Sequence, residues 1–179
     1  MKPARKLIVF ALCSTGLAAA VSFALPSSWE VAREIQIQAE ADEVHRVVAD
    51  LETWVHWFPW GRHVDPGVQM DVGSPARGAG ARLAWRGPQV GDGSLKVSFE
   101  DPAQGLWFDL ARRGDRERIK GAFQYEELHG SSTMVKLTLR GEVGLDPVER
   151  YLALARIYTL GPDLVDALER LERQVQSSL

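Results

Sequence analysis

The sequence of 179 residues has a single cysteine, Cys13, and only four histidines. One cysteine excludes an intrachain disulfide and a cysteine-based metal site. The histidines lack HExxH spacing, and no Gly-rich phosphate loop ending in Lys-Ser/Thr is present. A Gly-x-Ser-x-Gly nucleophile turn is missing too. We therefore expect no metal, no cofactor and no assigned catalytic residue.

An excess of positive charge is also missing. The first 28 residues contain three basic side chains and no acidic one, so residues 29–179 carry 18 basic and 24 acidic residues, a net charge of -6. Proteins that bind nucleic acid need a positive footprint for the phosphates. The composition therefore argues against a nucleic-acid partner.

Charge of either sign is missing from residues 7–25, which follow a basic start and end before Pro26. As a helix, this run would span roughly 28 Å, close to the hydrocarbon thickness of a bilayer. We expect residues 1–28 to be a transmembrane or signal segment, with its basic end in the cytoplasm. The predicted localisation is the cell membrane, single-pass, with the domain facing the periplasm or exterior. The alternative is secretion to the periplasm after signal cleavage.

Apolar and polar residues alternate in several short segments of residues 29–179, as expected for half-buried strands. The segments are residues 29–38, 81–86, 94–100, 106–112, 118–127 and 134–143. In the segment 94–100, alternation places Leu95, Val97 and Phe99 on one face. Turn formers separate the segments, and short consecutive strands with tight turns indicate an antiparallel sheet. The charged run 112–118 is interpreted as a solvated hairpin tip.

Two segments have the three- to four-residue period of helices. Residues 40–58 form the first, as one helix or two short helices, and Pro59 ends it. The second begins with Asp146 as a cap and Pro147 in the first helical position, and Gly161-Pro162 should kink or interrupt it. The chain is therefore predicted to be one α+β domain over residues 29–179, in which a long C-terminal helix covers an antiparallel sheet.

This order and several local motifs resemble the START-like (SRPBCC) superfamily, in particular its bacterial polyketide cyclase/dehydrase branch. The motifs are WEVAREIQIQAEADEVHRVVADLETWVHWFPW (29–60), GSPARGAGARLAWRG (73–87), VGDGSLKV (90–97), SSTMVKLTLRGEV (131–143) and GPDLVDALERLERQV (161–175). The resemblance covers residues 29–179 and implies a helix-grip fold, with the sheet and the C-terminal helix around an internal cavity. Because the motifs are structural, they do not define a reaction.

Candidate ligand-binding residues are aromatic side chains expected near or inside that cavity, with one arginine on an apolar strand face. They are Trp57, Trp60, Trp85, Phe99, Phe108, Phe123, Tyr125 and Arg33. Such rings also fit an ordinary filled core, and such an arginine also fits a surface ion pair or a snorkelling side chain. Among these residues, Tyr125 adds a hydroxyl group to the expected cavity, and Arg33 could bind an acidic head group of a ligand.

We expect these residues to serve binding rather than catalysis. The favoured hypothesis is a membrane-tethered extracytoplasmic domain that holds a hydrophobic small molecule or lipid. One alternative is a cyclase- or dehydratase-like enzyme with Tyr125, Arg33 or a histidine as acid or base. Another is an envelope protein-interaction module with Trp57 and Trp60 exposed as a docking patch.

Overall fold

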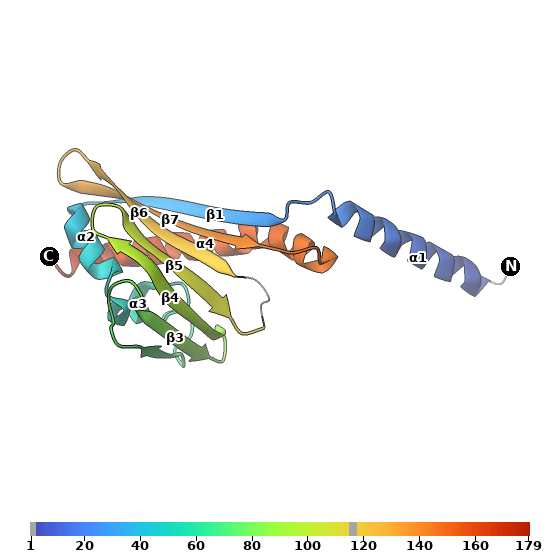
Figure 1. Cartoon of the computed structure of the whole chain (residues 1–179), viewed down its shortest axis with the longest axis horizontal. Coiled ribbons are helices and arrows are strands. Elements are labelled where there is room, and N and C mark those ends of the chain that lie inside the picture. The colour runs from blue at the N-terminus through green and yellow to red at the C-terminus, as the bar shows by residue number, and fades with distance from the viewer. Residues whose placement is uncertain (1–2, 115–117) are drawn as a thin grey trace.

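The structure is a computed structural model that describes residues 3–114 and 118–179, without the side chains of residues 3–9, 11, 18 and 19. Residues 115–117, the middle of the predicted hairpin tip, lie outside the described part. Seven antiparallel strands form one sheet in the order β1-β7-β6-β5-β4-β3-β2 (Figure 1). The strands are β1 (Ser28–Ile37), β2 (Gln69–Val72), β3 (Arg82–Gly87), β4 (Gly91–Asp101), β5 (Gly105–Arg112), β6 (Ile119–Leu128) and β7 (Ser132–Glu142).

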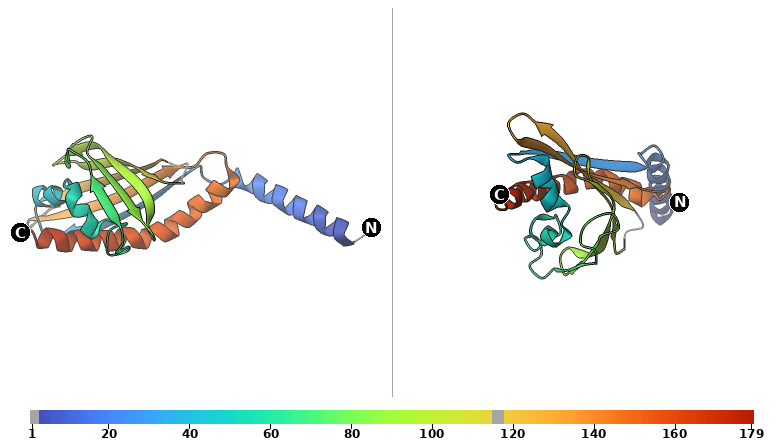
Figure 2. Two further views of the ribbon diagram at one scale, coloured as in Figure 1. Left: turned by 90° about the horizontal axis from the view of Figure 1, so that it is seen from below. Right: turned by 60° about the vertical axis from the view of Figure 1, so that its left-hand side comes forward.

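The helices connect and cover this sheet. They are α1 (Pro3–Ser22), α2 (Ala41–Val48), the 3-10 turn η1 (Leu51–Thr53), α3 (Trp54–Trp57) and α4 (Pro147–Gln176). Because β1 and β2 are the two edge strands, the segment with α2, η1 and α3 crosses from one edge to the other. The long helix α4 lies along one face of the sheet (Figure 2). This is the α+β helix-grip arrangement that the sequence predicted.

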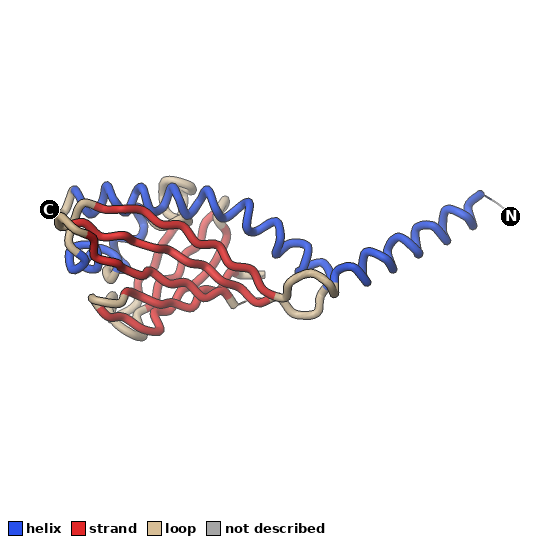
Figure 3. Tube along the Cα trace, turned by 90° about the horizontal axis from the view of Figure 1, so that it is seen from above, coloured by secondary structure: helices blue, strands red, loops and turns tan. Residues whose placement is uncertain are grey.

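The predicted start of the last helix is confirmed. The Asp146 carboxylate accepts a hydrogen bond from the backbone N–H of Val148, and Pro147 occupies the first turn, where its missing N–H costs no helical hydrogen bond. Helix α4 continues through Pro162, so the expected interruption does not occur. The helix instead bends along its length (Figure 3), a common effect of a proline within a helix.

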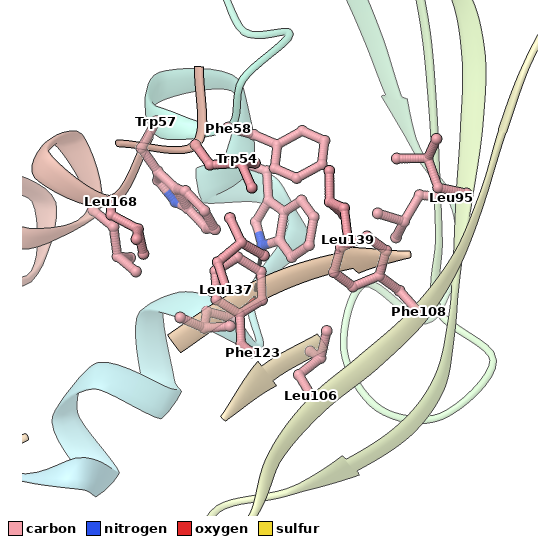
Figure 4. Packing of buried hydrophobic residues seen from close by; sticks show 14 of the residues in the cluster. Trp54, Trp57, Phe58, Leu95, Leu106, Phe108, Phe123, Leu137, Leu139 and Leu168 are labelled. Carbon is pink, nitrogen blue, oxygen red and sulfur yellow. Dashed lines mark hydrogen bonds between the residues drawn. The ribbon is translucent and has the colours of Figure 1, made fainter. Parts of the chain in front are cut away.

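A cluster of buried aromatic rings fills the space between α3, α4 and the sheet (Figure 4). Trp54 lies at its centre, with its ring centroid 4.4 Å from that of Phe58 and 5.6 Å from that of Phe108. Its indole N–H donates a 2.9 Å hydrogen bond to the carbonyl of Val48, so the buried polar atom is satisfied. Helix α4 adds the predicted apolar stripe of Leu164, Leu168, Leu171 and Val175.

The alternation of strand β4 is broken by a β-bulge between Val97 and Phe99. Val97 pairs with Phe108 and Phe99 pairs with Trp107, so Ser98 is the additional residue. After the bulge each side chain points to the opposite face from the one that alternation predicts. The prediction that Phe99 faces the interior is therefore wrong, because its side chain lies on the outer face, 44% exposed.

Helix α1 projects from the domain (Figure 1), and Arg150 of α4 joins it to the domain. The buried guanidinium of Arg150 donates hydrogen bonds to the carbonyl oxygens of Ser22, Phe23 and Leu25, at 3.1–3.2 Å. It also donates to the carbonyl of Gly144. One side chain on α4 therefore fixes the connection between α1 and β1.

In the described part of the chain, no helix is long and apolar enough to cross a membrane. This finding contradicts the localisation predicted for the chain, at the cell membrane or secreted to the periplasm. The prediction was based on the apolar run 7–25. Helix α1 also includes Arg5 and Lys6 before this run, and the run itself contains Ser14, Thr15 and Gly16 in the middle of the helix.

Candidate functional site

A crevice of about 250 Å³ opens where α4 meets the ends of β5, β6 and β7. We call it the helix–sheet crevice. It combines apolar side chains with three arginines, and its lining residues are Trp60, Arg112, Arg113, Ile119, Leu139, Arg156, Thr159 and Leu160. Such a mixture of apolar surface and a few polar groups is typical of small-molecule sites.

Trp60 lines the crevice and is supported by a second tryptophan from another part of the chain. Trp60 follows α3 and stacks on Trp85 of β3, with 5.4 Å between the ring centroids and an interplanar angle of 7°. The guanidinium of Arg112 lies 5.5 Å from the Trp60 centroid and donates a 3.2 Å hydrogen bond to the carbonyl of Val90. The aromatic surface and this cation are thus held against each other.

Two further arginines lie between α4 and β1. The Arg156 guanidinium is 5.5 Å from the Trp29 centroid. Arg33 lies against α4 at Gly161, where an added Cβ would be 2.4 Å from its Nη2 atom. Arg33 donates a hydrogen bond to the carbonyl of Ala32, and no carboxylate of the described residues lies within ion-pair distance of it. Glycine at 161 leaves the space that this half-buried cation occupies.

Asp163 on α4 is an acidic side chain that interacts electrostatically with Arg112. Burial and the charge of Asp166 raise the pKa of Asp163, while Arg112 acts in the opposite direction. The charges of Arg112 and Asp163 thus influence each other at the edge of the crevice.

The predicted pocket residues are divided between the crevice and the core. Trp60 lines the crevice, Trp85 stacks beneath it, and Arg33 lies beside it at Gly161. Trp57, Phe108 and Phe123 instead contact other rings in the interior, and each is at most 1% exposed. These three rings fill the core.

Tyr125 lies at the other end of the sheet, in a polar cluster with His45 and Glu100. The Tyr125 hydroxyl is 3.4 Å from His45 Nδ1, and His45 Nε2 is 3.4 Å from Glu100 Oε1. The backbone N–H of Gly78 donates a 2.7 Å hydrogen bond to the other oxygen of Glu100. Burial and the Glu100 carboxylate raise the pKa of Tyr125. The three side chains line none of the hollows that we describe.

Sequence reasoning missed most of the residues that line the crevice. Arg112 was assigned to a solvated tip, although it continues the inward alternation of Phe108 and Leu110. That continuation was the available signal. Arg156 and Leu160 share a helix face because they are four residues apart, but nothing in the sequence places that face against β6 and β7.

Comparison with known proteins supports the fold. No protein-family model matches the chain, and no curated protein does either. Among solved structures, norcoclaurine synthase from Thalictrum flavum, in complex with dopamine and hydroxybenzaldehyde, is 15% identical with a TM-score of 0.63, covering 84% of this chain and 87% of that one. The structure of Ara h 8.0201 is 12% identical with a TM-score of 0.55, and the match covers 84% of this chain and 99% of that one.

A third structure is the di-domain ARO/CYC protein BexL from the BE-7585A biosynthetic pathway. It is 21% identical with a TM-score of 0.59, and the match covers 82% of this chain and 46% of that one. At these identities the likeness shows the fold. The predicted helix-grip fold is confirmed, and the fold of these neighbours agrees with the predicted resemblance to START-like (SRPBCC) proteins.

Proposed function

We propose that residues 29–179 form a domain that binds a hydrophobic small molecule with an acidic group in the helix–sheet crevice. The observation that carries the proposal is the meeting of apolar walls with arginines in one hollow. Trp60 and Arg33, predicted from the sequence as ligand-binding residues, are part of this proposal. Residues 1–28 are proposed as a separate N-terminal segment without an assigned function.

The apolar part of the ligand would lie against Trp60, Ile119, Leu139 and Leu160. Burial of apolar surface provides about 25 cal/mol per Å², from which the cost of association is subtracted. A hollow of about 250 Å³ is at the small end for a ligand pocket. We therefore expect a compact ligand, or one that remains partly exposed.

The acidic group of the ligand would interact with Arg112 and Arg156. A guanidinium binds a carboxylate or phosphate through parallel N–H donors, which favours these groups over neutral ones. Arg33 extends the cationic surface along α4. An uncharged ligand of the same size would leave these guanidinium groups without a new partner.

The two alternatives receive less support. Trp57 and Trp60 are 1% and 6% exposed, so the docking patch proposed for an interaction module is not on the surface. The enzyme alternative would use His45, Glu100 and Tyr125, which form a connected polar cluster. Because the crevice and this cluster lie at different ends of the sheet, we do not assign a reaction to the domain.

The experiment is calorimetric titration of the full chain with octanoate and, separately, octanol. We expect octanoate to bind and octanol to bind roughly tenfold more weakly, since a charge-assisted hydrogen bond is absent. Arg156→Gln should weaken octanoate binding by a similar factor. Arg46→Gln, an exposed arginine on α2, is the matched control and should have no effect.

Thermal melts of both variants show whether each remains folded. Equal affinity for octanoate and octanol would contradict the role of the arginines. If Arg156→Gln and the unmodified chain bound octanoate with equal affinity, this would contradict binding in the helix–sheet crevice.

A further inference from the structure

The outer face of the sheet, turned away from α4 (Figure 2), has a hollow of about 520 Å³ beside the β4 bulge. We call it the outer hollow, and its lining side chains include Ser98, Phe99, Gln104, Trp107, Asp109 and Lys120. Phe99 and Trp107 are cross-strand partners, with ring centroids 5.2 Å apart and an interplanar angle of 67°. Two neighbouring aromatic rings thus meet solvent on a face that is otherwise polar.

The bulge at Ser98 is the reason for this exposure. If β4 paired regularly with β5, Ser98 would lie opposite Trp107, and Phe99 would lie opposite Leu106 and point to the core, as the alternation predicts. Bulges often redirect a side chain beside a functional site. An aromatic ring on the surface lacks the stabilisation that burial would provide. A binding function of the exposed ring would compensate for this loss.

Positive charge lies next to the two rings. Lys120 lines the outer hollow and is paired across the strands with Asp109, which is in turn paired with Lys96. Neither lysine has a carboxylate within ion-pair distance among the residues that the structure describes. Asp109 and Lys120 also line a second hollow of about 780 Å³, which Lys96 and Arg82 share. The two hollows are therefore adjacent.

Cross-strand pairing brings like charges together in this second hollow. Arg82 faces Lys96 directly within the hollow. At its border, Lys120 faces Arg140, which lies outside the hollow and is also opposite Glu30. Directly opposed like charges destabilise a sheet, whereas an anion between them would relieve the repulsion. The chain as a whole has a net charge of -3, so this local excess of cations is a feature of the outer face.

We propose that the outer hollow is a second binding site, for a small aromatic anion. The planar ring would stack against Phe99 and Trp107, and the carboxylate, sulfonate or phosphate would contact Lys120 and Lys96. Asp109 between the lysines would accept a hydrogen bond from a hydroxyl or amino substituent. This site is on the opposite face of the sheet from the helix–sheet crevice and does not depend on the function proposed there.

The test is calorimetric titration with 1-naphthoate and with neutral 1-naphthalenemethanol. Phe99→Ala and Lys120→Gln should each weaken 1-naphthoate binding roughly tenfold, and the neutral probe should bind more weakly than the anion. Lys136→Gln, an exposed lysine of the same face on β7, and Tyr158→Ala, an exposed aromatic on α4, are the matched controls and should bind as the unmodified chain does.

Arg156→Gln separates this site from the crevice. It should leave 1-naphthoate binding unchanged, and a loss of binding on this substitution alone would place the probe in the crevice and overturn the proposal. Absence of 1-naphthoate binding would also overturn it, and so would a Phe99→Ala or Lys120→Gln variant that binds 1-naphthoate as tightly as the unmodified chain does. Saturable binding of polyglutamate without binding of 1-naphthoate would assign the face to an acidic protein partner instead.

Discussion

At the scale of single residues, Trp54 is a central part of the interior packing. It is fully buried, its ring contacts those of Trp57, Phe58, Phe108 and Phe123, and its N–H is hydrogen-bonded. Its burial follows from its position in an amphipathic segment that ends at a proline. The sequence therefore predicted that it lies inside, but not that its neighbours would fill the expected cavity.

We expect Trp54→Ala to lower the free energy of unfolding by about 3–5 kcal/mol, because it leaves a cavity and removes a hydrogen bond to the Val48 carbonyl. Urea unfolding followed by circular dichroism measures the change. Tyr158→Ala, at a side chain that is 81% exposed, should change stability by no more than about 0.5 kcal/mol. Similar losses for both variants would contradict the assigned packing.

Asp65 is a second residue whose role is visible only in the fold. Its buried carboxylate accepts hydrogen bonds from the backbone N–H groups of Gly67, Gln89 and Val90, which joins the loop after α3 to the β3–β4 turn. Burial acts to raise the pKa of Asp65, but these three donors prevail and lower it below its ordinary value.

A lowered pKa in the folded state means that the carboxylate stabilises the fold above the unfolded-state pKa of about 3.9 and that this contribution is lost as the pH falls through the folded value. Asp65→Asn should therefore unfold at lower urea than the unmodified chain near neutral pH. The difference should shrink below about pH 4. Asp71→Asn, at an exposed position, is the control, and a difference that stays constant with pH would contradict the account.

At the scale of elements, alternation and helical period predicted six of the seven strands and the main helices. They missed β2, an edge strand of only four residues, because so short a segment shows little alternation. They also missed the bulge in β4, since an additional residue in a ladder depends on pairing with β5. The positions of Phe99 and Glu100 could therefore not be predicted from β4 alone.

Thiol labelling tests the bulge directly. In a Cys13→Ser background, which removes the only native thiol, we expect Phe99→Cys to react rapidly with a water-soluble disulfide reagent. Leu95→Cys, on the buried face of the same strand, should react many-fold more slowly, because access limits thiol exchange. A protected thiol at position 99 would show that β4 follows the regular alternation.

At the scale of the whole molecule, the order of elements predicted an antiparallel sheet covered by a long helix. The resemblance of several motifs to START-like proteins implied the helix-grip fold, and the likeness to solved structures agrees with it. The crevice was predicted only in part. Trp60 and Arg33 could be named from a tryptophan-rich motif and an arginine on an apolar face. Arg112, Arg156 and Leu160 come together only because α4 lies across the ends of β5–β7, and that packing depends on residues far apart in the sequence.

The most direct test of the central claim is an amide chemical-shift map of the full chain titrated with octanoate. The account predicts saturable shifts concentrated at Arg112, Ile119, Leu139, Thr159 and Leu160, which line the crevice, with little change at Glu126 on the outer part of β6. Shifts centred on His45 and Tyr125, or no saturable shifts at all, would contradict binding in the helix–sheet crevice.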